Sequence, residues 1–164
     1  MMVSMGYVNE NLISGENVTY RAAMHWTVFL KPGLAALAIL GIAVLWVYLQ
    51  GPAPGWVSAG LAVVAAIPIL SAAIARSTAE FAVTNKRVIL KTGFIQKKTA
   101  EMFLNKVESV GVDQSMAGRL LGYGAIVIRG TGGTLEPFDR ISAPLEFRRQ
   151  IQEQIGRSFE PMSR

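Results

Sequence analysis

The chain of 164 residues contains no cysteine and only one histidine, His25. Without cysteine it can form no disulfide and no thiolate metal site, and a single histidine gives little support for zinc chemistry. The glycine-rich run at 130–133 connects two expected strands and opens no helix, so it lacks the setting of a phosphate-binding loop. No nucleophile–base set is recognisable either. These absences predict a protein that is not an enzyme and that has no metal and no cofactor.

Charge is missing from two long apolar runs, Pro32–Leu49 and Trp56–Ala75. A membrane-spanning helix needs ~20 mostly apolar residues. The runs therefore predict a transmembrane helix hairpin over residues 26–76, with spans at about 27–49 and 56–75. A secretory signal peptide is the alternative for the first run. The run is longer than the usual ~7–15 apolar residues of such a peptide, and no small-residue cleavage site follows it.

The distribution of basic residues predicts an orientation. The loop Gln50–Gly55 carries no charge, whereas Arg21, Lys31, Arg76 and Lys86 flank the other ends of the two runs. Lys and Arg near membrane spans mark the cytoplasmic side. We therefore expect a multi-pass protein of the bacterial inner membrane, with both termini in the cytoplasm and residues 1–25 forming a cytoplasmic arm.

Beyond residue 76 the pattern changes to short alternating runs bounded by turn residues, which predict β-strands. The arm contains a similar alternation at Val18–Ala22, and we expect that strand to join the same sheet. Met116–Leu121 reads as a short helical turn closed by Gly122. The expected strands of the soluble part are Thr78–Thr84, Arg87–Thr92, Phe94–Leu104, Val107–Asp113, Gly124–Arg129 and Thr134–Ile141.

One amphipathic helix follows at 144–156. Phe147, Ile151 and Ile155 recur every four residues and form an apolar stripe. Ser142 is the expected N-cap, and Gly156 is expected to end the helix. Residues 77–157 are thus predicted to form one mainly β domain, followed by a tail at 158–164. Six to seven strands would build a bent sheet or open barrel capped by the C-terminal helix.

Several segments together resemble the bacterial pleckstrin-homology-like membrane proteins. They are Phe81–Ile89, Leu104–Val110, Asp113–Ser115 and Arg119–Gly124. The resemblance implies a pleckstrin-homology (PH) type fold and a membrane location, and it implies no defined ligand.

The candidate site rests on charge. The formal net charge is +5, and the basic residues are scattered rather than interleaved with aromatic residues, so nucleic acid is not an expected partner. Besides the lipid bilayer, the sequence leaves two hypotheses open. One is a binding or scaffold module for a protein partner or a second copy of the chain, and the other is a sensor of anionic lipid headgroups. The candidate headgroup-binding residues are Lys86, Arg87, Lys91, Lys97 and Lys98.

Overall fold

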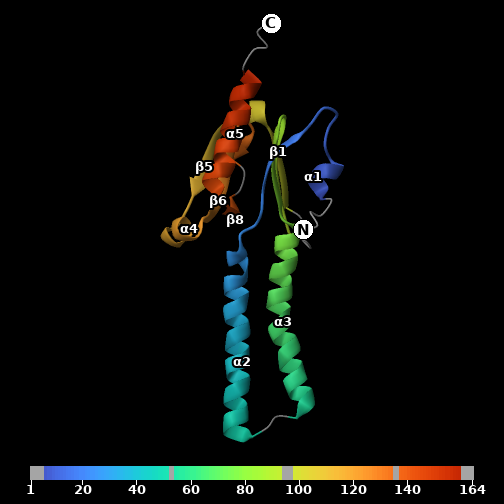
Figure 1. Cartoon of the computed structure of the whole chain (residues 1–164), viewed down its shortest axis with the longest axis vertical. Coiled ribbons are helices and arrows are strands. Elements are labelled where there is room, and N and C mark those ends of the chain that lie inside the picture. The colour runs from blue at the N-terminus through green and yellow to red at the C-terminus, as the bar shows by residue number, and fades with distance from the viewer. Residues whose placement is uncertain (1–5, 52–53, 94–97, 135–136, 160–164) are drawn as a thin grey trace. The chain divides into compact units, whose positions relative to one another are not determined.

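The computed structural model divides the chain into two compact units (Figure 1). Trp26–Ser77 forms one of them, here called the hairpin unit. The other, here called the β unit, combines Met1–His25 with Thr78–Arg164. The structure describes residues 6–51, 54–93, 98–134 and 137–159. The arm therefore shares a unit with the strands that follow the hairpin.

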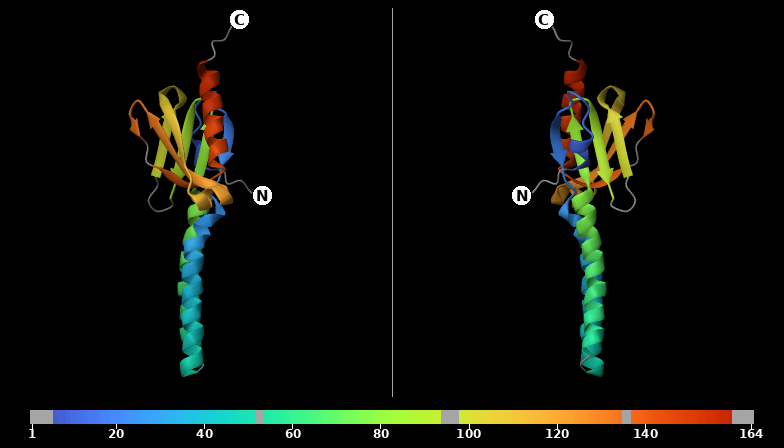
Figure 2. Two further views of the ribbon diagram at one scale, coloured as in Figure 1. Left: turned by 90° about the vertical axis from the view of Figure 1, so that its left-hand side faces the viewer. Right: turned by 90° about the vertical axis from the view of Figure 1, so that its right-hand side faces the viewer.

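The hairpin unit consists of two long antiparallel helices preceded by one short turn of helix (Figures 1 and 2). The short 3₁₀ helix η1 spans Trp26–Phe29, α2 spans Leu30–Gln50, and α3 spans Gly55–Thr78. Two stretches of 24 residues, Trp26–Leu49 and Gly55–Thr78, are long and apolar enough to cross a membrane. The second helix extends three residues beyond the expected end at Ala75, because no helix-breaking residue follows there.

The first sheet of the β unit has the order β1-β2-β3-β4, with every neighbouring pair antiparallel. The arm strand is confirmed: β1 pairs with β2, and Ala22 lies opposite Phe81. Because β1 precedes the hairpin unit and β2 follows it, the hairpin is an insertion between two paired strands. The strand bounds are Val18–Ala22 for β1, Glu80–Thr84 for β2, Arg87–Thr92 for β3 and Lys98–Phe103 for β4.

The second sheet is built around β6, which pairs antiparallel with β5, β7 and β8. A bridge between Met24 and Ile141 connects it to the arm, and the Ser142 amide donates to the Ala23 carbonyl. The described residues thus contain eight strands in two sheets, whereas the sequence predicted a bent sheet or open barrel of six to seven strands. The bounds are Val107–Asp113 for β5, Tyr123–Gly130 for β6, Gly133–Thr134 for β7 and Phe138–Ser142 for β8.

Several strand limits differ from the expected ones. β2 begins at Glu80 because α3 still includes Thr78. The third expected strand, Phe94–Leu104, is β4 from Lys98 onward; Phe94–Lys97 lie outside the described residues, and Leu104–Lys106 forms the 3₁₀ helix η2. The strand expected at Thr134–Ile141 is divided between β7 and β8. Pro137 directly precedes β8 and has no amide hydrogen for a sheet.

The last helix, α5, spans Pro144–Phe159, so it begins at the predicted residue and ends three residues later than predicted. Ser142 is not the N-cap, because it belongs to β8. Ala143 precedes the helix instead, with a positive φ of 48°, and its carbonyl accepts from the Phe147 amide at 3.1 Å. Gly156 does not end the helix, and nothing lies within 4 Å of the position that a Cβ would take there.

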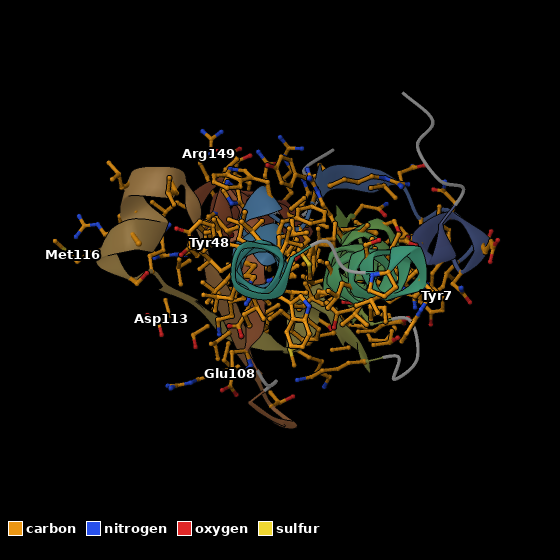
Figure 3. The ribbon with its side chains drawn as sticks, turned by 90° about the horizontal axis from the view of Figure 1, so that it is seen from below. Tyr7, Tyr48, Glu108, Asp113, Met116 and Arg149 are labelled. Carbon is orange, nitrogen blue, oxygen red and sulfur yellow. The ribbon has the colours of Figure 1, made fainter. Side chains whose placement is uncertain are left out.

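Two short helices lie on opposite sides of the β unit, near the labelled residues Tyr7 and Met116 of Figure 3. The first, α1, spans Tyr7–Glu10, and the second, α4, spans Met116–Leu121. The prediction for α4 is confirmed, including its end: Gly122 has the left-handed conformation, with φ 77°. On the other side, Val8 of α1 is buried with Ala82 and Ile89.

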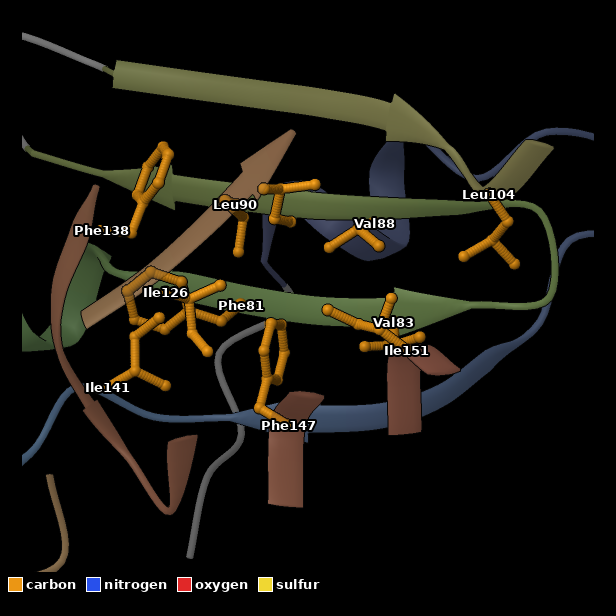
Figure 4. Close-up of a cluster of buried hydrophobic side chains, with 11 residues drawn as sticks. Phe81, Val83, Val88, Leu90, Leu104, Ile126, Phe138, Ile141, Phe147 and Ile151 are labelled. Atoms are coloured by element: carbon orange, nitrogen blue, oxygen red, sulfur yellow. The ribbon is translucent and has the colours of Figure 1, made fainter. Parts of the chain in front are cut away.

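The main core lies between the two sheets and α5 (Figure 4). Phe81 meets Phe138 edge to face, with ring centroids 6.4 Å apart, and Phe147 packs 6.2 Å from Tyr20. Phe147 and Ile151 are fully buried, so the predicted apolar stripe faces this core. The helix packs against strands of both sheets, β1 and β2 of the first and β5 and β6 of the second.

Candidate functional site

The candidate basic residues that the structure describes lie on the β2–β3 turn, on β3 and on β4. Lys86 stands in the turn, where its Nζ donates to the Ser14 carbonyl at 2.6 Å. Asn85 beside it donates from Nδ2 to the Gly15 carbonyl at 3.1 Å and accepts from the Asn17 amide at 2.9 Å. This turn therefore holds the arm just before β1 begins.

Arg87, the first residue of β3, lies inside the protein. Its Nε and Nη2 donate to the two carboxylate oxygens of Glu16 at 3.0 and 3.1 Å, and its Nη1 donates to Glu101 at 2.6 Å. It also donates to the backbone carbonyl of Asn11. The Arg87 side chain is 9% exposed and the Glu16 side chain is 0% exposed. The guanidinium thus joins the arm to β3 and β4 and is not available to a headgroup in this conformation.

Glu16 accepts further hydrogen bonds. The Thr84 hydroxyl donates to Oε1 at 2.7 Å, and the Ile13 amide donates to Oε2 at 2.8 Å. Burial alone would raise the pKa of Glu16, but these donors and the Arg87 guanidinium outweigh it and hold the pKa below its usual value of 4.5. The carboxylate therefore stays charged within a bidentate ion pair whose remaining oxygen positions are satisfied.

Lys91, further along β3, faces the first helix of the arm. Its Nζ lies 3.7 Å from Glu80 and 4.5 Å from the centroid of the Tyr7 ring. The same Glu80 carboxylate accepts from the amides of Tyr7 and Val8 at 2.9 and 3.1 Å, at the N-terminus of α1. The Tyr7 hydroxyl donates to Glu101 at 3.1 Å, and this hydrogen bond is the main reason that the Tyr7 pKa is raised. Lys91 therefore completes a second contact between arm and sheet.

Another candidate, Lys98, is the first residue of β4. Lys98 is exposed, with its Nζ 5.3 Å from the centroid of the Phe138 ring, whereas Lys97 lies outside the described residues. The structure thus separates the four described candidates by role. Lys86, Arg87 and Lys91 hold the arm against the sheet, and Lys98 faces solvent.

Sequence reasoning missed Glu16, the acidic partner on which the arm depends. Glu16 and Arg87 are 71 positions apart, and neither stands in a local motif. The one available signal was that Glu16 lies only two positions before the alternating strand that begins at Val18, so it had to lie near the sheet. In the part of the chain that the structure describes, no group of three or more histidine, aspartate or glutamate side chains could hold a metal ion.

Comparison with known families places the fold. Residues 27–155 match the family described as Bacterial PH domain, which is more than half of the chain. The chain belongs to this family. The matched region includes the hairpin unit and most of the β unit, and the two antiparallel sheets with a C-terminal helix agree with a PH-like fold. PH-like domains are generally binding modules. Comparisons with curated proteins and with solved structures give no match.

The family match begins after the arm. Glu16 and β1 therefore precede the matched residues, whereas their partners Arg87 and β2 lie within them. The arm completes a PH-like sheet from outside the matched residues.

Proposed function

We propose that this protein is a binding module anchored in the bacterial inner membrane by its helix hairpin. The β unit faces the cytoplasm and acts without catalysis, by binding a protein partner or a second copy of the chain. Membership of the Bacterial PH domain family supports the binding role.

The exposure of the two apolar helices carries the proposal. In the most apolar 18-residue stretch of each candidate span, only 11% is buried within the protein. Leu34, Val44 and Leu49 of α2 are 65–70% exposed, and Ile67 of α3 is 58% exposed. A core helix of a soluble protein would be mostly buried, whereas helices that contact lipid leave such side chains on their surface. Neither run contains a charged residue that would oppose insertion.

The orientation follows from charge. The turn between α2 and α3 is uncharged, and basic residues stand at the opposite helix ends, namely Lys31 and Arg76. The positive-inside rule then assigns these ends, and the β unit connected to them, to the cytoplasm.

The edge of β5 offers a surface for a partner. Among the described strands β5 pairs only with β6, so its other edge can accept an added strand. Gly111 lies in the middle of β5, and a Cβ there would meet nothing closer than the Val127 carbonyl at 3.6 Å. Because an alanine would fit, the fold does not require glycine at this position. A glycine inside a strand is typical of places where another backbone approaches closely.

Headgroup sensing by the five basic residues is the weaker hypothesis. Three of them already bind the arm, and Arg87 would have to leave Glu16 before it could reach a lipid phosphate. Lys98 is the described member that is exposed.

Single-cysteine labelling tests the topology, because the chain has no cysteine of its own. Gly55→Cys places a thiol at the start of α3, where nothing lies within 4 Å of the added Cβ, and Glu108→Cys places one on an exposed position of β5. In bacterial spheroplasts, a membrane-impermeant maleimide should label the Gly55→Cys variant at once and the Glu108→Cys variant only after lysis. Membrane anchoring would be contradicted if alkaline carbonate released the protein from the membrane and neither variant was labelled before lysis.

A further inference from the structure

The short helix α4 presents large apolar side chains to solvent. Met116 is 84% exposed and Leu120 is 87% exposed, and residues four positions apart share one face of a helix. Met116 lies at the outer margin of the β unit in Figure 3. A Cβ added to the buried Gly118, two residues from each, would lie 2.6 Å from the Tyr123 carbonyl. The helix backbone therefore packs directly on the start of β6, and the opposite face points outward.

The outward face is held in place by both ends of the helix. The Ser115 hydroxyl accepts from the Gly118 amide at 3.1 Å at the first turn. At the other end Gly122 closes the helix in the left-handed conformation, and its carbonyl accepts from the Ala143 amide at 2.9 Å. Two residues beyond Ala143, Leu145 is 60% exposed and lines a shallow surface pocket together with Arg119 and Gly122. A preformed apolar surface of this kind marks an interaction site.

The position of α4 in the β unit indicates what covers this surface. Tyr123 directly follows Gly122, and the His25 ring stacks on the Tyr123 ring with centroids 5.3 Å apart. The His25 amide also donates to the Arg140 carbonyl at 2.7 Å. His25 is the last residue of the β unit before the hairpin, and the first candidate span begins at Trp26. The end of the β unit that carries α4 is thus the end from which the chain enters the apolar helix.

We propose that α4 docks on the surface of the membrane that the hairpin crosses, with Met116, Leu120 and Leu121 at the boundary between headgroups and acyl chains. Exposed Arg119, on the same helix, would then contact anionic headgroups. This inference rests on the proposed function. A helix of six residues is too short to anchor a protein alone. Tethered to a membrane span, it meets the bilayer at high effective concentration. Contact at both α4 and the tether would give the β unit one fixed orientation.

Depth-dependent fluorescence quenching in the full chain tests the proposal. Single-cysteine variants Met116→Cys and Leu120→Cys are labelled with an environment-sensitive dye and reconstituted into vesicles of phosphatidylethanolamine and phosphatidylglycerol. Glu108→Cys is the matched control, since it lies five residues from the α4 end of β5, ~17 Å at the usual rise per residue. Gly41→Cys, in the middle of α2, reports whether the hairpin is inserted.

In the vesicles, the dye at positions 116 and 120 should have blue-shifted emission, and shallow nitroxide lipids should quench it. The dye at position 108 should show neither change. Quenching at position 41 but not at 116 or 120 overturns the docking of α4 and leaves the anchored module intact. A blue shift at 116 and 120 without lipid quenching also overturns it, because a protein surface then covers the helix. Loss of quenching at position 41 overturns the proposed function together with this inference.

Discussion

At the scale of single residues, the contact between arm and sheet depends on one buried ion pair. Glu16 and Arg87 are 5% and 8% exposed as whole residues. Glu16 also accepts a hydrogen bond from Thr84, and Arg87 also donates one to Glu101. A buried pair of this kind adds little net stability compared with apolar residues of similar shape, whereas the loss of one partner leaves an uncompensated charge. The two side chains should therefore behave very differently in single and in double variants.

Arg87→Met should destabilise the β unit by ~3–5 kcal/mol, because it leaves the Glu16 carboxylate buried without its cation. Urea unfolding of the full chain in detergent, followed by circular dichroism, measures the effect. Arg148→Met is the control, since Arg148 is exposed on α5, and it should change stability by less than ~0.5 kcal/mol. The double variant Glu16→Gln/Arg87→Met should recover part of the loss. Equal losses in the single and double variants would show that the ion pair is not the cause.

The lowered pKa of Glu16 predicts a loss of stability in acid. Folded Glu16 binds a proton more weakly than the unfolded chain, whose Glu titrates near 4.5, so the unfolded state holds more protons between the two values. Stability therefore rises with pH across this interval, is fully present above about 4.5, and is lost as the pH falls through the folded pKa. The urea midpoint measured from acid to neutral pH should show this slope.

Glu16→Gln should flatten that slope even if it lowers the stability at neutral pH. Glu146→Gln is the comparison, because the pKa of Glu146 is also lowered, chiefly by the hydrogen bond from Arg149. That pair is largely exposed, at 34% and 63%, and surface pairs contribute little. An unchanged slope in the Glu16→Gln variant would assign the acid sensitivity to other carboxyl groups.

At the scale of elements, the arm should be needed for the β unit to fold. Removal of residues 1–23 takes away β1 and Glu16, which exposes the edge of β2 and leaves Arg87 without its main partner. The shortened chain, which begins at Met24, should unfold at lower urea and be cleaved faster by protease. Removal of residues 1–12 takes α1 but keeps Glu16 and β1, so it should have a smaller effect. Equal unfolding midpoints for the shortened and full chains would contradict this prediction.

The elements also show what the sequence could and could not predict. β3 and β5 match their predicted bounds because alternating apolar residues and flanking turns are local signals. The N-cap of α5 was assigned wrongly because Ser142 has a suitable side chain but is held in β8 by its bond to the Ala23 carbonyl. The role of Arg87 could not be predicted, since its buried partner is brought close only when β1 pairs with β2 across the inserted hairpin. A basic strand residue is equally consistent with an exposed surface.

At the scale of the whole molecule, the two units should lose their structure under different conditions. The hairpin helices satisfy their backbone hydrogen bonds within each helix, and a detergent micelle shields their apolar side chains from urea. The β unit depends on a water-excluded core of side chains such as Phe81 and Ile151, which urea solvates. We therefore expect urea to unfold the β unit while α2 and α3 remain helical.

The chain provides separate probes for the two units. All three tryptophans, Trp26, Trp46 and Trp56, lie in the hairpin unit, whereas every strand that the structure describes lies in the β unit. In detergent, the far-ultraviolet circular dichroism signal should show one cooperative transition and keep a helical remainder, and tryptophan emission should stay nearly constant across it. Trp26→Phe removes the tryptophan next to the β unit, so that only positions inside the hairpin report. A tryptophan transition that coincides with the loss of strand signal in this variant would mean that hairpin and β unit form a single cooperative structure.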